Sequence, residues 1–186
     1  MNNSSVVDIS VIEKLKAYYE LLKPRLSFLV TFSSGSGYML GAAGPIDWLS
    51  FIAFCLCGFL ISGASVTINQ IKEVEFDKVM KRTAARPMPT NRINSAEANV
   101  FTLLCLVTGT LLLYFFTNPL TVLLTLVSTI LYSYVYTPLK RVGPIAVFVG
   151  AIPGALPPLI GWVAVSGGFS LEAFIIFGIQ IVWQFP

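Results

Sequence analysis

The sequence predicts an all-α membrane protein, a bundle of about six transmembrane helices. The first observation is composition: the 186-residue chain is 55% hydrophobic and 11% charged, whereas soluble domains usually carry about 25% charged residues. The mean hydropathy of +0.79 agrees with this. The second observation is that the apolar residues are gathered into runs of about 20, the length that crosses a bilayer. A chain of this kind lacks the polar groups to cover a water-facing surface.

The predicted spans follow one another with short connections that carry turn residues. Asn118 followed by Pro119 is typical of an N-cap and the first residue of a helix. Asn94 with Glu97 three residues later indicates a capping box at the start of the third span. The six apolar runs are residues 26–43, 48–71, 97–116, 119–137, 144–165 and 170–186.

The N-terminal segment, residues 1–25, is predicted to lie outside the bilayer. It has no apolar stretch or cleavage site typical of a secretory signal, and it is poorer in arginine than a mitochondrial transit peptide. We therefore expect a mature bacterial N-terminus, followed by one membrane-embedded domain over residues 26–186. An amphipathic helix lying on the membrane surface is expected within the segment, with one face formed by Val11, Leu15, Tyr18, Tyr19 and Leu22.

The positive charges predict the orientation of the chain. All twelve Lys and Arg residues lie before the first span, between the second and third spans, or between the fourth and fifth spans. With six spans these three places share one side of the membrane, and the positive-inside rule assigns that side to the cytoplasm. The expected location is the inner membrane of a bacterial cell, with the N-terminus in the cytoplasm.

The segment NQIKEVEFDKVMKRTAARPMP, residues 69–89, places acids and then bases directly after an apolar run. Asn69, Glu73 and Asp77 are spaced by four, so a continuing helix aligns them in one stripe, with about 6 Å between successive members. Such oxygen ligands suit Mg²⁺, which one or two carboxylates commonly hold together with phosphate oxygens. Glu75 lies off the stripe and is interpreted as a solvated acid.

The cations after the stripe suit a polyanion. Lys81, Arg82 and Arg86 follow the acids, and a guanidinium group can grip phosphate with two donors at once. Pro87 disfavours helix at Arg86, so the helix is predicted to end there and to continue as a loop folded back over the site. Acids, cations and a membrane together indicate a lipid diphosphate as the ligand. The alternative is a cytoplasmic loop whose charges form only surface ion pairs.

A second polar stretch, YTPLKR, follows the fourth span. It puts Tyr136, Lys140 and Arg141 at the predicted cytoplasmic end of that span, where they are candidate substrate ligands. The alternative is an interfacial tyrosine with cations that extend toward water. The sequence alone leaves both interpretations open.

The stretch VGAIPGALPPLIGW, residues 149–162, has three prolines and three glycines within one span. Irregular backbone at membrane depth is tolerated where it packs against protein or lines a cavity. This span is therefore a candidate wall of a pocket for a bulky planar substrate, with Trp162 among the candidate ligands. The alternative is that Gly150 and Gly154 simply permit close helix packing.

Several residue types restrict the chemistry. The chain has no histidine, which excludes a His metal ligand or a His general base within these 186 residues. Cys55, Cys57 and Cys105 lie in apolar runs and are interpreted as small buried hydrophobes. A transporter or channel would place ionisable residues at mid-membrane, whereas the charges here lie at the ends of the predicted spans.

These motifs resemble the UbiA superfamily of membrane prenyltransferases and, more narrowly, its protohaem IX farnesyltransferase branch. The superfamily pattern Asn-x-x-x-Asp-x-x-x-Asp matches Asn69, Glu73 and Asp77, with Glu in place of the commoner middle Asp. The stretches MKRT, RPMP, YTPLKR and GALPPLIGW are similar to that branch in the same order and spacing. The resemblance extends from about Leu22 onward.

The resemblance implies an activity, a metal and a set of site residues. The activity is transfer of farnesyl from farnesyl diphosphate to a vinyl group of haem b, giving haem O for haem–copper oxidases. The implied metal is Mg²⁺, held by Asn69, Glu73 and Asp77. The implied catalytic residues are these three with Arg82, Arg86 and Lys140, and the implied substrate-binding residues are Lys81, Tyr136, Arg141 and Trp162.

The resemblance also implies about nine spans and a second acidic motif, which these 186 residues do not contain. Because the last run is still apolar at Pro186, we interpret the chain as the N-terminal part of a longer protein. Expected partners are the lipid bilayer and haem A synthase or oxidase assembly factors, and no nucleic acid is expected. The alternatives are another UbiA-type aromatic prenyltransferase, acting on a quinone precursor, and an inactive truncated form.

Overall fold

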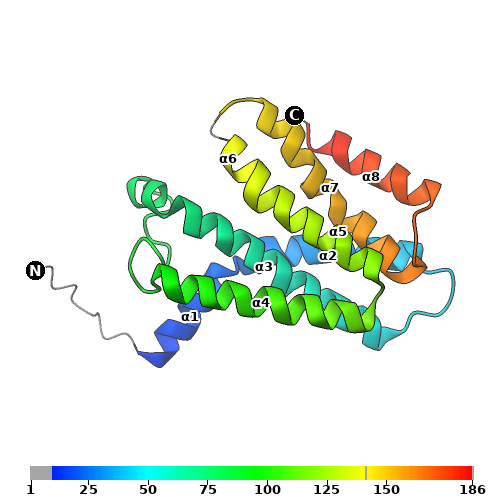
Figure 1. Ribbon diagram of the computed structural model, residues 1–186, viewed down its shortest axis with the longest axis horizontal. Helices are drawn as coiled ribbons and strands as arrows, with labels where there is room; N and C mark the ends of the chain where they lie inside the picture. Colours follow the sequence, from blue (N-terminus) through cyan, green and yellow to red (C-terminus); the bar gives the residue numbers. More distant parts are fainter. Residues whose placement is uncertain (1–9, 141, 186) are drawn as a thin grey trace, which may run out of the picture.

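The computed structural model describes residues 10–140 and 142–185, and within them it contains helices and turns but no strand (Figure 1). This confirms the all-α prediction. Each predicted run corresponds to a helical stretch, although the helix that begins at Trp48 continues past residue 71 to Val79 and the run 119–137 comprises three successive helical elements. The elements are α1 (Val11–Leu21), α2 (Pro24–Gly41), α3 (Trp48–Val79), α4 (Ser95–Phe116), α5 (Pro119–Ile130), the π-helix η1 (Leu131–Tyr136), α6 (Thr137–Leu139), α7 (Ile145–Ser166) and α8 (Leu171–Trp183).

The predicted number of six spans is not confirmed. Four helical stretches of the described residues are long and apolar enough to cross a membrane: α3, α4, the α5–α6 stretch Pro119–Leu139, and α7. Helix α8 has only 13 residues. Helix α2 is not among the four; it begins with Pro24 and Arg25 and contains several serines and glycines that lower its hydropathy.

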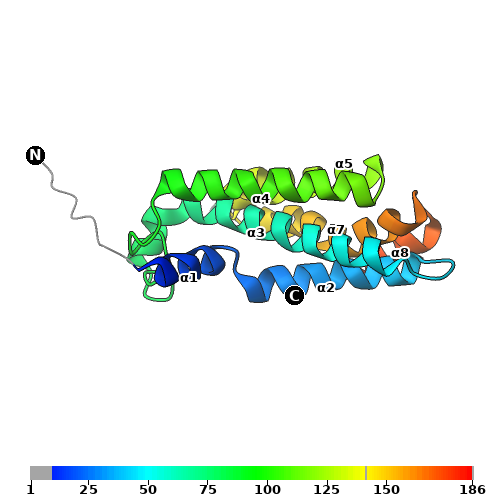
Figure 2. The same ribbon diagram turned by 90° about the horizontal axis from the view of Figure 1, so that it is seen from below.

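The longer helices form a bundle with its connections at two ends. Helix α2 packs against α3 and α7, and α3 packs against α4. Figure 2 shows α1 and the α3–α4 loop at one end, and the α2–α3 loop at the opposite end. The basic α3–α4 loop and the cations around α1 therefore share one end of the bundle.

The predicted N-caps are confirmed. The Asn94 side chain accepts a hydrogen bond from the backbone N–H of Glu97, and the Glu97 side chain completes the capping box. The Asn118 side chain accepts from the backbone N–H of Thr121. It also donates to the carbonyl of Val163 at 2.8 Å, which ties the start of α5 to α7.

The predicted N-terminal helix is present as α1, although only part of its apolar face is buried against the bundle. Leu22 is buried and Tyr18 packs on an aromatic ring of α4, whereas Val11, Leu15 and Tyr19 are exposed. The exposed half is suited to a membrane surface. The location of α1 at the membrane surface remains a prediction.

Helices α2 and α7 approach closely because small residues lie between them. A Cβ added at Gly161 would lie 1.8 Å from the carbonyl oxygen of Ser34, and one added at Gly37 would lie 2.0 Å from the carbonyl oxygen of Pro158. Neither backbone can accept a side chain without moving. Glycine here brings α7 against α2, which fixes one wall of the site described below.

Replacing Gly161 by Ala is therefore expected to destabilise the bundle by about 1–3 kcal/mol, the usual cost of overpacking a closely packed contact. Thermal unfolding in detergent should show a lower midpoint. The matched control is Gly178→Ala on α8, where an added Cβ meets nothing within 4 Å. Equal midpoints for Gly161→Ala and the unmodified chain would contradict the close α2–α7 contact.

Candidate active site

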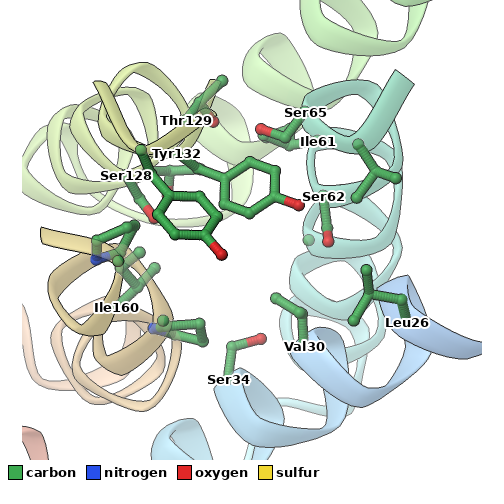
Figure 3. A pocket seen from close by; sticks show the side chains of 18 of the residues that line it. Leu26, Val30, Ser34, Ile61, Ser62, Ser65, Ser128, Thr129, Tyr132 and Ile160 are labelled. Atoms are coloured by element: carbon green, nitrogen blue, oxygen red, sulfur yellow. The ribbon is translucent and has the colours of Figure 1, made fainter. Parts of the chain in front are cut away.

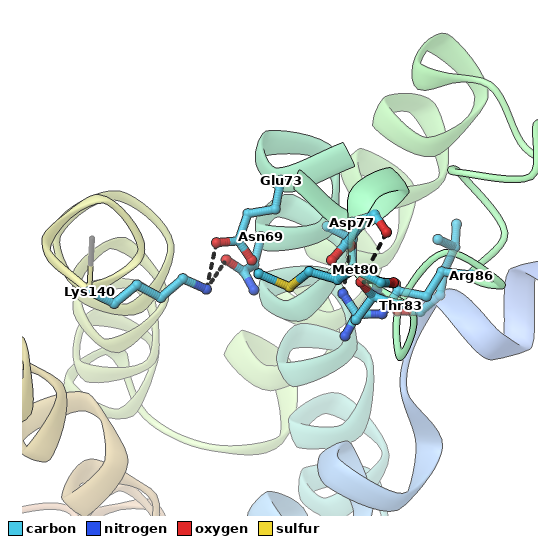
Figure 4. Close-up of polar contacts among 9 residues, drawn as sticks. Asn69, Glu73, Asp77, Met80, Thr83, Arg86 and Lys140 are labelled. Carbon is cyan, nitrogen blue, oxygen red and sulfur yellow. Dashed lines mark hydrogen bonds and ion pairs between the residues drawn. The ribbon is translucent and has the colours of Figure 1, made fainter. Parts of the chain in front are cut away.

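Helix α3 continues without interruption from its apolar part into the acidic segment, as predicted. It carries Asn69, Glu73 and Asp77 along one face (Figure 4). Asn69 and Asp77 are buried, and the side chain of Glu73 is only 12% exposed. Burying carboxylates in this way requires nearby cations or hydrogen-bond donors.

Two cations from distant parts of the chain meet these acids (Figure 4). The Nζ atom of Lys140 lies 2.6 Å from Oε1 of Glu73 and 3.4 Å from Oδ1 of Asn69. The Nη1 atom of Arg86 lies 2.6 Å from Oδ2 of Asp77. The stripe therefore belongs to a charged site to which α3, the α3–α4 loop and the end of α6 all contribute.

The prediction that the helix ends at Arg86 is wrong. Helix α3 ends at Val79, and Met80 is extended with φ −87° and ψ 120°. The hydroxyl of Thr83 donates to the carbonyl of Asp77 at 3.0 Å, which holds the turn that brings Arg86 back. Had the helix continued, nine residues would separate Arg86 from Asp77 by about 13 Å along the axis.

The other predicted site residues do not all lie at the charged site. Lys81 and Arg82 are exposed in the α3–α4 loop, with no ion pair to another described residue. Trp162 packs against Gly41 and is not among the residues that line the cavity described next. Arg141 lies outside the described residues.

A cavity of about 330 Å³ lies between α2, α3, the α5–η1 stretch and α7 (Figure 3). Its walls are mainly aliphatic, aromatic and glycine or proline residues, with hydroxyl groups from several helices. Figure 3 shows Ser62 and Ser65 on α3 facing Tyr132 across the space. The hydroxyl-bearing lining residues are Ser34, Ser62, Ser65, Thr125, Ser128, Thr129, Tyr132 and Tyr136.

The cavity and the charged stripe follow one another along the same elements of the fold. Gly58 and Ser62 line the cavity, and Asn69 and Glu73 follow on the same face of α3 at helical spacing. On the opposite wall, Tyr136 lines the cavity one turn before the lysine that pairs with Glu73. A ligand with an anionic head and an apolar tail would fit this arrangement.

The Pro- and Gly-rich stretch of α7 both lines the cavity and packs closely against neighbouring residues, so the structure agrees with both interpretations given above. Its three internal prolines do not interrupt the helix, and Gly150, Pro153, Gly154 and Pro157 line the cavity. An added Cβ at Gly150 would lie 2.6 Å from the ring of Tyr136. The small residues therefore leave room for the cavity and also allow close packing.

Sequence reasoning missed Lys72 and the π-helix that it contacts. The Lys72 ammonium donates to the carbonyl of Ser133 at 2.8 Å and lies 3.6 Å from the centroid of the Tyr134 ring. In the same π-helix, Tyr132 and Tyr136 are stacked with ring centroids 5.7 Å apart. Single π-helical turns often mark functional sites, but no local pattern in LYSYVY predicts one.

The stripe suits Mg²⁺ only in combination with a ligand. Among residues 10–140 and 142–185, no group of three or more His, Cys, Asp or Glu side chains could hold a metal by itself. Asn69, Glu73 and Asp77 provide two carboxylates and one amide oxygen. Mg²⁺ is commonly held by one or two carboxylates while phosphate oxygens and water complete its shell, so this donor set fits a metal–diphosphate complex.

The fold and the site together define an integral membrane protein of the all-α class, with a buried set of acids and cations at the end of an apolar cavity. Residues 28–186 match the UbiA prenyltransferase family. The chain belongs to that family, which confirms the resemblance of the motifs.

Two curated relatives show where the similarity lies. The chain is 47% identical over 173 residues to a protoheme IX farnesyltransferase of Cytophaga hutchinsonii, covering 93% of this chain and 60% of the relative. It is 41% identical over 166 residues to the mitochondrial protoheme IX farnesyltransferase of Homo sapiens, covering 89% of this chain and 37% of the relative. The chain thus spans less than two thirds of the length of either protein.

Solved structures share the fold. A digeranylgeranylglyceryl phosphate synthase superposes with a TM-score of 0.80 at 24% identity, covering 92% of this chain and 60% of the other. A UbiA homolog from Archaeoglobus fulgidus, bound to DMAPP and Mg²⁺, superposes with a TM-score of 0.73 at 17% identity, covering 89% and 60%. At these identities the comparison establishes the helical fold.

Proposed function

We propose that this chain forms the farnesyl-diphosphate site of an enzyme that transfers farnesyl to a vinyl group of haem b and so produces haem O. The observation that carries the proposal is that the charged stripe follows the lining residues of the apolar cavity on the same face of α3. The names of the Cytophaga and human relatives support the choice of farnesyl and protohaem as substrates.

The charged residues would bind and orient the diphosphate. Arg86 and Lys140 reach the stripe from two sides and can transfer their hydrogen bonds from the acids to phosphate oxygens. Asn69, Glu73 and Asp77 would hold Mg²⁺, which when bound neutralises negative charge on the leaving diphosphate. Lys81 and Arg82, exposed on the same loop as Arg86, are further candidate cations.

The cavity would hold the farnesyl chain and keep water from it. In the proposed reaction the bond between C1 of farnesyl and the diphosphate oxygen breaks. A vinyl carbon of haem b then forms the new carbon–carbon bond, and water adds as hydroxyl with loss of a proton. Tyr136 lines the cavity beside the stripe, and Arg141 and Trp162 remain candidate substrate-binding residues. No covalent intermediate with the protein is required.

The proposed setting is the inner membrane of a bacterial cell, with the N-terminus and the site on the cytoplasmic side. The cations around α1 and the α3–α4 loop lie at one end of the bundle (Figure 2), which supports this orientation. Haem A synthase or oxidase assembly factors are the proposed partners, since haem O is destined for haem–copper oxidases.

A reporter that is active only in the cytoplasm should therefore be active when inserted within residues 78–92 and inactive when inserted beside Asn118. Alkaline phosphatase, active only outside the cytoplasm, serves as the reciprocal reporter at the same two positions. The opposite pair of results would show that the charge-based orientation is wrong.

Pigment analysis of cells that lack their own haem O synthase tests the function. A chimera in which this chain is joined to the remaining C-terminal length of the Cytophaga relative should produce haem O. The 186 residues alone should produce none, because they supply one acidic motif where the family resemblance implies two. Prenylated quinone precursors without haem O would favour the alternative prenyltransferase, and haem O from the short form would show that one motif suffices.

A further inference from the structure

The π-helix η1 leaves one backbone carbonyl without a backbone donor. In an α-helix the carbonyl of Ser133 would accept from the N–H of Thr137, four residues later. Here that N–H donates to the carbonyl of Tyr132 instead, in the five-residue pattern of a π-helix. In the same pattern the donor to Ser133 would be Pro138, which has no N–H. Because Ser133 is fully buried, its carbonyl needs a partner from elsewhere in the fold.

Lys72 on α3 is that partner. Its Nζ atom donates to the Ser133 carbonyl at 2.8 Å and lies 3.6 Å from the centroid of the Tyr134 ring. The Ser133 hydroxyl makes a second contact with α3, since it donates to the carbonyl of Ser65 at 3.4 Å. The π-helix is therefore held to α3 at two points about two turns apart. The upper point, Lys72, directly precedes Glu73 of the charged stripe.

The residues that follow this carbonyl belong to the candidate active site. Tyr136, three residues later, lines the cavity and stacks on Tyr132. The backbone N–H of Lys140 donates to the Tyr136 carbonyl at 3.0 Å, and the Lys140 ammonium lies 2.6 Å from Glu73. Lys72 is not among the described residues that line the cavity. Its route to the cavity wall and to the Lys140 ammonium is therefore the π-helix.

We propose that Lys72 is a positioning residue of this site. The inference rests on the proposed function. Its hydrogen bond fixes the π-helix against α3, so that Tyr136 stays on the cavity wall and Lys140 stays beside Glu73. A cation that is already held in place binds a diphosphate without the cost of ordering its side chain. Helix α3 thus carries the acids of the stripe and also, through Lys72, holds the cation that meets them.

Binding of inorganic pyrophosphate with Mg²⁺ to the chain in nanodiscs tests this by calorimetry. Lys72→Met removes the donor and should weaken affinity about three- to tenfold, the range for losing one hydrogen bond that orders a binding group. Lys72→Arg keeps a charged donor and should stay within about twofold of the unmodified chain. The matched control is Lys78→Met, which removes the same charge from α3. Lys78 is exposed and pairs with Glu75, so its loss should also change affinity less than about twofold.

A double-mutant cycle separates positioning from a direct electrostatic role of Lys72. Adding Lys72→Met to Lys140→Met should weaken affinity less than about twofold further, because the group that Lys72 positions is already gone. A lysine that attracts the diphosphate directly would instead give losses that multiply, as independent sites do. Multiplying losses, or unchanged affinity in a folded Lys72→Met variant, would overturn the inference and leave the proposed function intact.

Tyr134 provides a second measurement that does not depend on whether Lys72→Met folds, since its side chain is 57% exposed. Tyr134→Leu removes the aromatic face beside the Lys72 ammonium and should weaken pyrophosphate binding about two- to fivefold, the usual range for a cation–π contact at an exposed site. Tyr134→Phe keeps a ring and should bind like the unmodified chain. Equal affinities for the two variants would overturn the inference alone. Failure of the unmodified chain to bind pyrophosphate would overturn the proposed function as well.

Discussion

Replacing Asp77 by Asn is expected to lower the rate of haem O formation by about 10²- to 10³-fold, the usual cost of losing one preorganised electrostatic group. Asp77 is buried and holds Arg86 at 2.6 Å, so the substitution removes a proposed metal ligand and loosens a phosphate-binding cation. Glu73→Gln should have a similar effect through Lys140. Initial rates of the chimera with the Cytophaga C-terminal length, at varied farnesyl diphosphate, provide the measurement.

The matched control is Glu75→Gln, two residues from each acid on the same helix. Glu75 is exposed and pairs with Lys78 at 2.7 Å, away from the stripe. Its removal should change the rate by less than about twofold, since exposed ion pairs contribute little. Equal losses at all three positions would mean that the segment requires overall negative charge rather than one aligned stripe.

Replacing Ser62 by Phe is expected to raise the KM for farnesyl diphosphate at least about tenfold, because the added ring would occupy the cavity where the prenyl chain is proposed to lie. Ser62 lines that cavity two turns before Asn69 on α3. Affinity for pyrophosphate should remain close to that of the unmodified chain, because the charged stripe is untouched. The combination of a raised KM and retained pyrophosphate binding separates a blocked tail site from a damaged head site.

Leu104→Phe on α4 is the control for added bulk, since Leu104 is 60% exposed on the bundle surface. It should leave both quantities near their original values. A Ser62→Phe variant with an unchanged KM would show that the tail of the substrate lies elsewhere.

Helix positions could be predicted from sequence because the signals are local. Apolar runs of bilayer length and the caps at Asn94 and Asn118 each act within one helix, and the structure has helices at those places. The alignment of Asn69, Glu73 and Asp77 also required only that α3 continue. The order of the motifs then sufficed to indicate the family.

The assembled site depends on contacts that no local pattern contains. Pro87 indicates only that the helix cannot continue beyond Arg86. Helix α3 in fact ends at Val79, where the chain turns and brings Arg86 next to Asp77. The pairing of Glu73 with Lys140 joins segments far apart in the chain. The same is true of the cavity, whose walls come from several helices and from a π-helix that the sequence does not signal.

Trp162 illustrates the same limit: its motif suggested a pocket residue, whereas in the structure it packs close to Gly41 on α2. The spacing of residues along one helix can be predicted from the sequence. Which other helix packs against each face cannot.

The most direct test of the central claim is photoaffinity labelling with a farnesyl diphosphate analogue that carries a photoreactive group at the end of its prenyl chain. In the presence of Mg²⁺, the label should attach to residues lining the cavity on α3, α5 or α7, such as Ser62, Ser128 and Ile160 (Figure 3). Excess farnesyl diphosphate should abolish labelling, and Asp77→Asn should reduce it. Labelling confined to the outer surface of the bundle, or labelling that farnesyl diphosphate does not reduce, would contradict a single site that joins the stripe to the cavity.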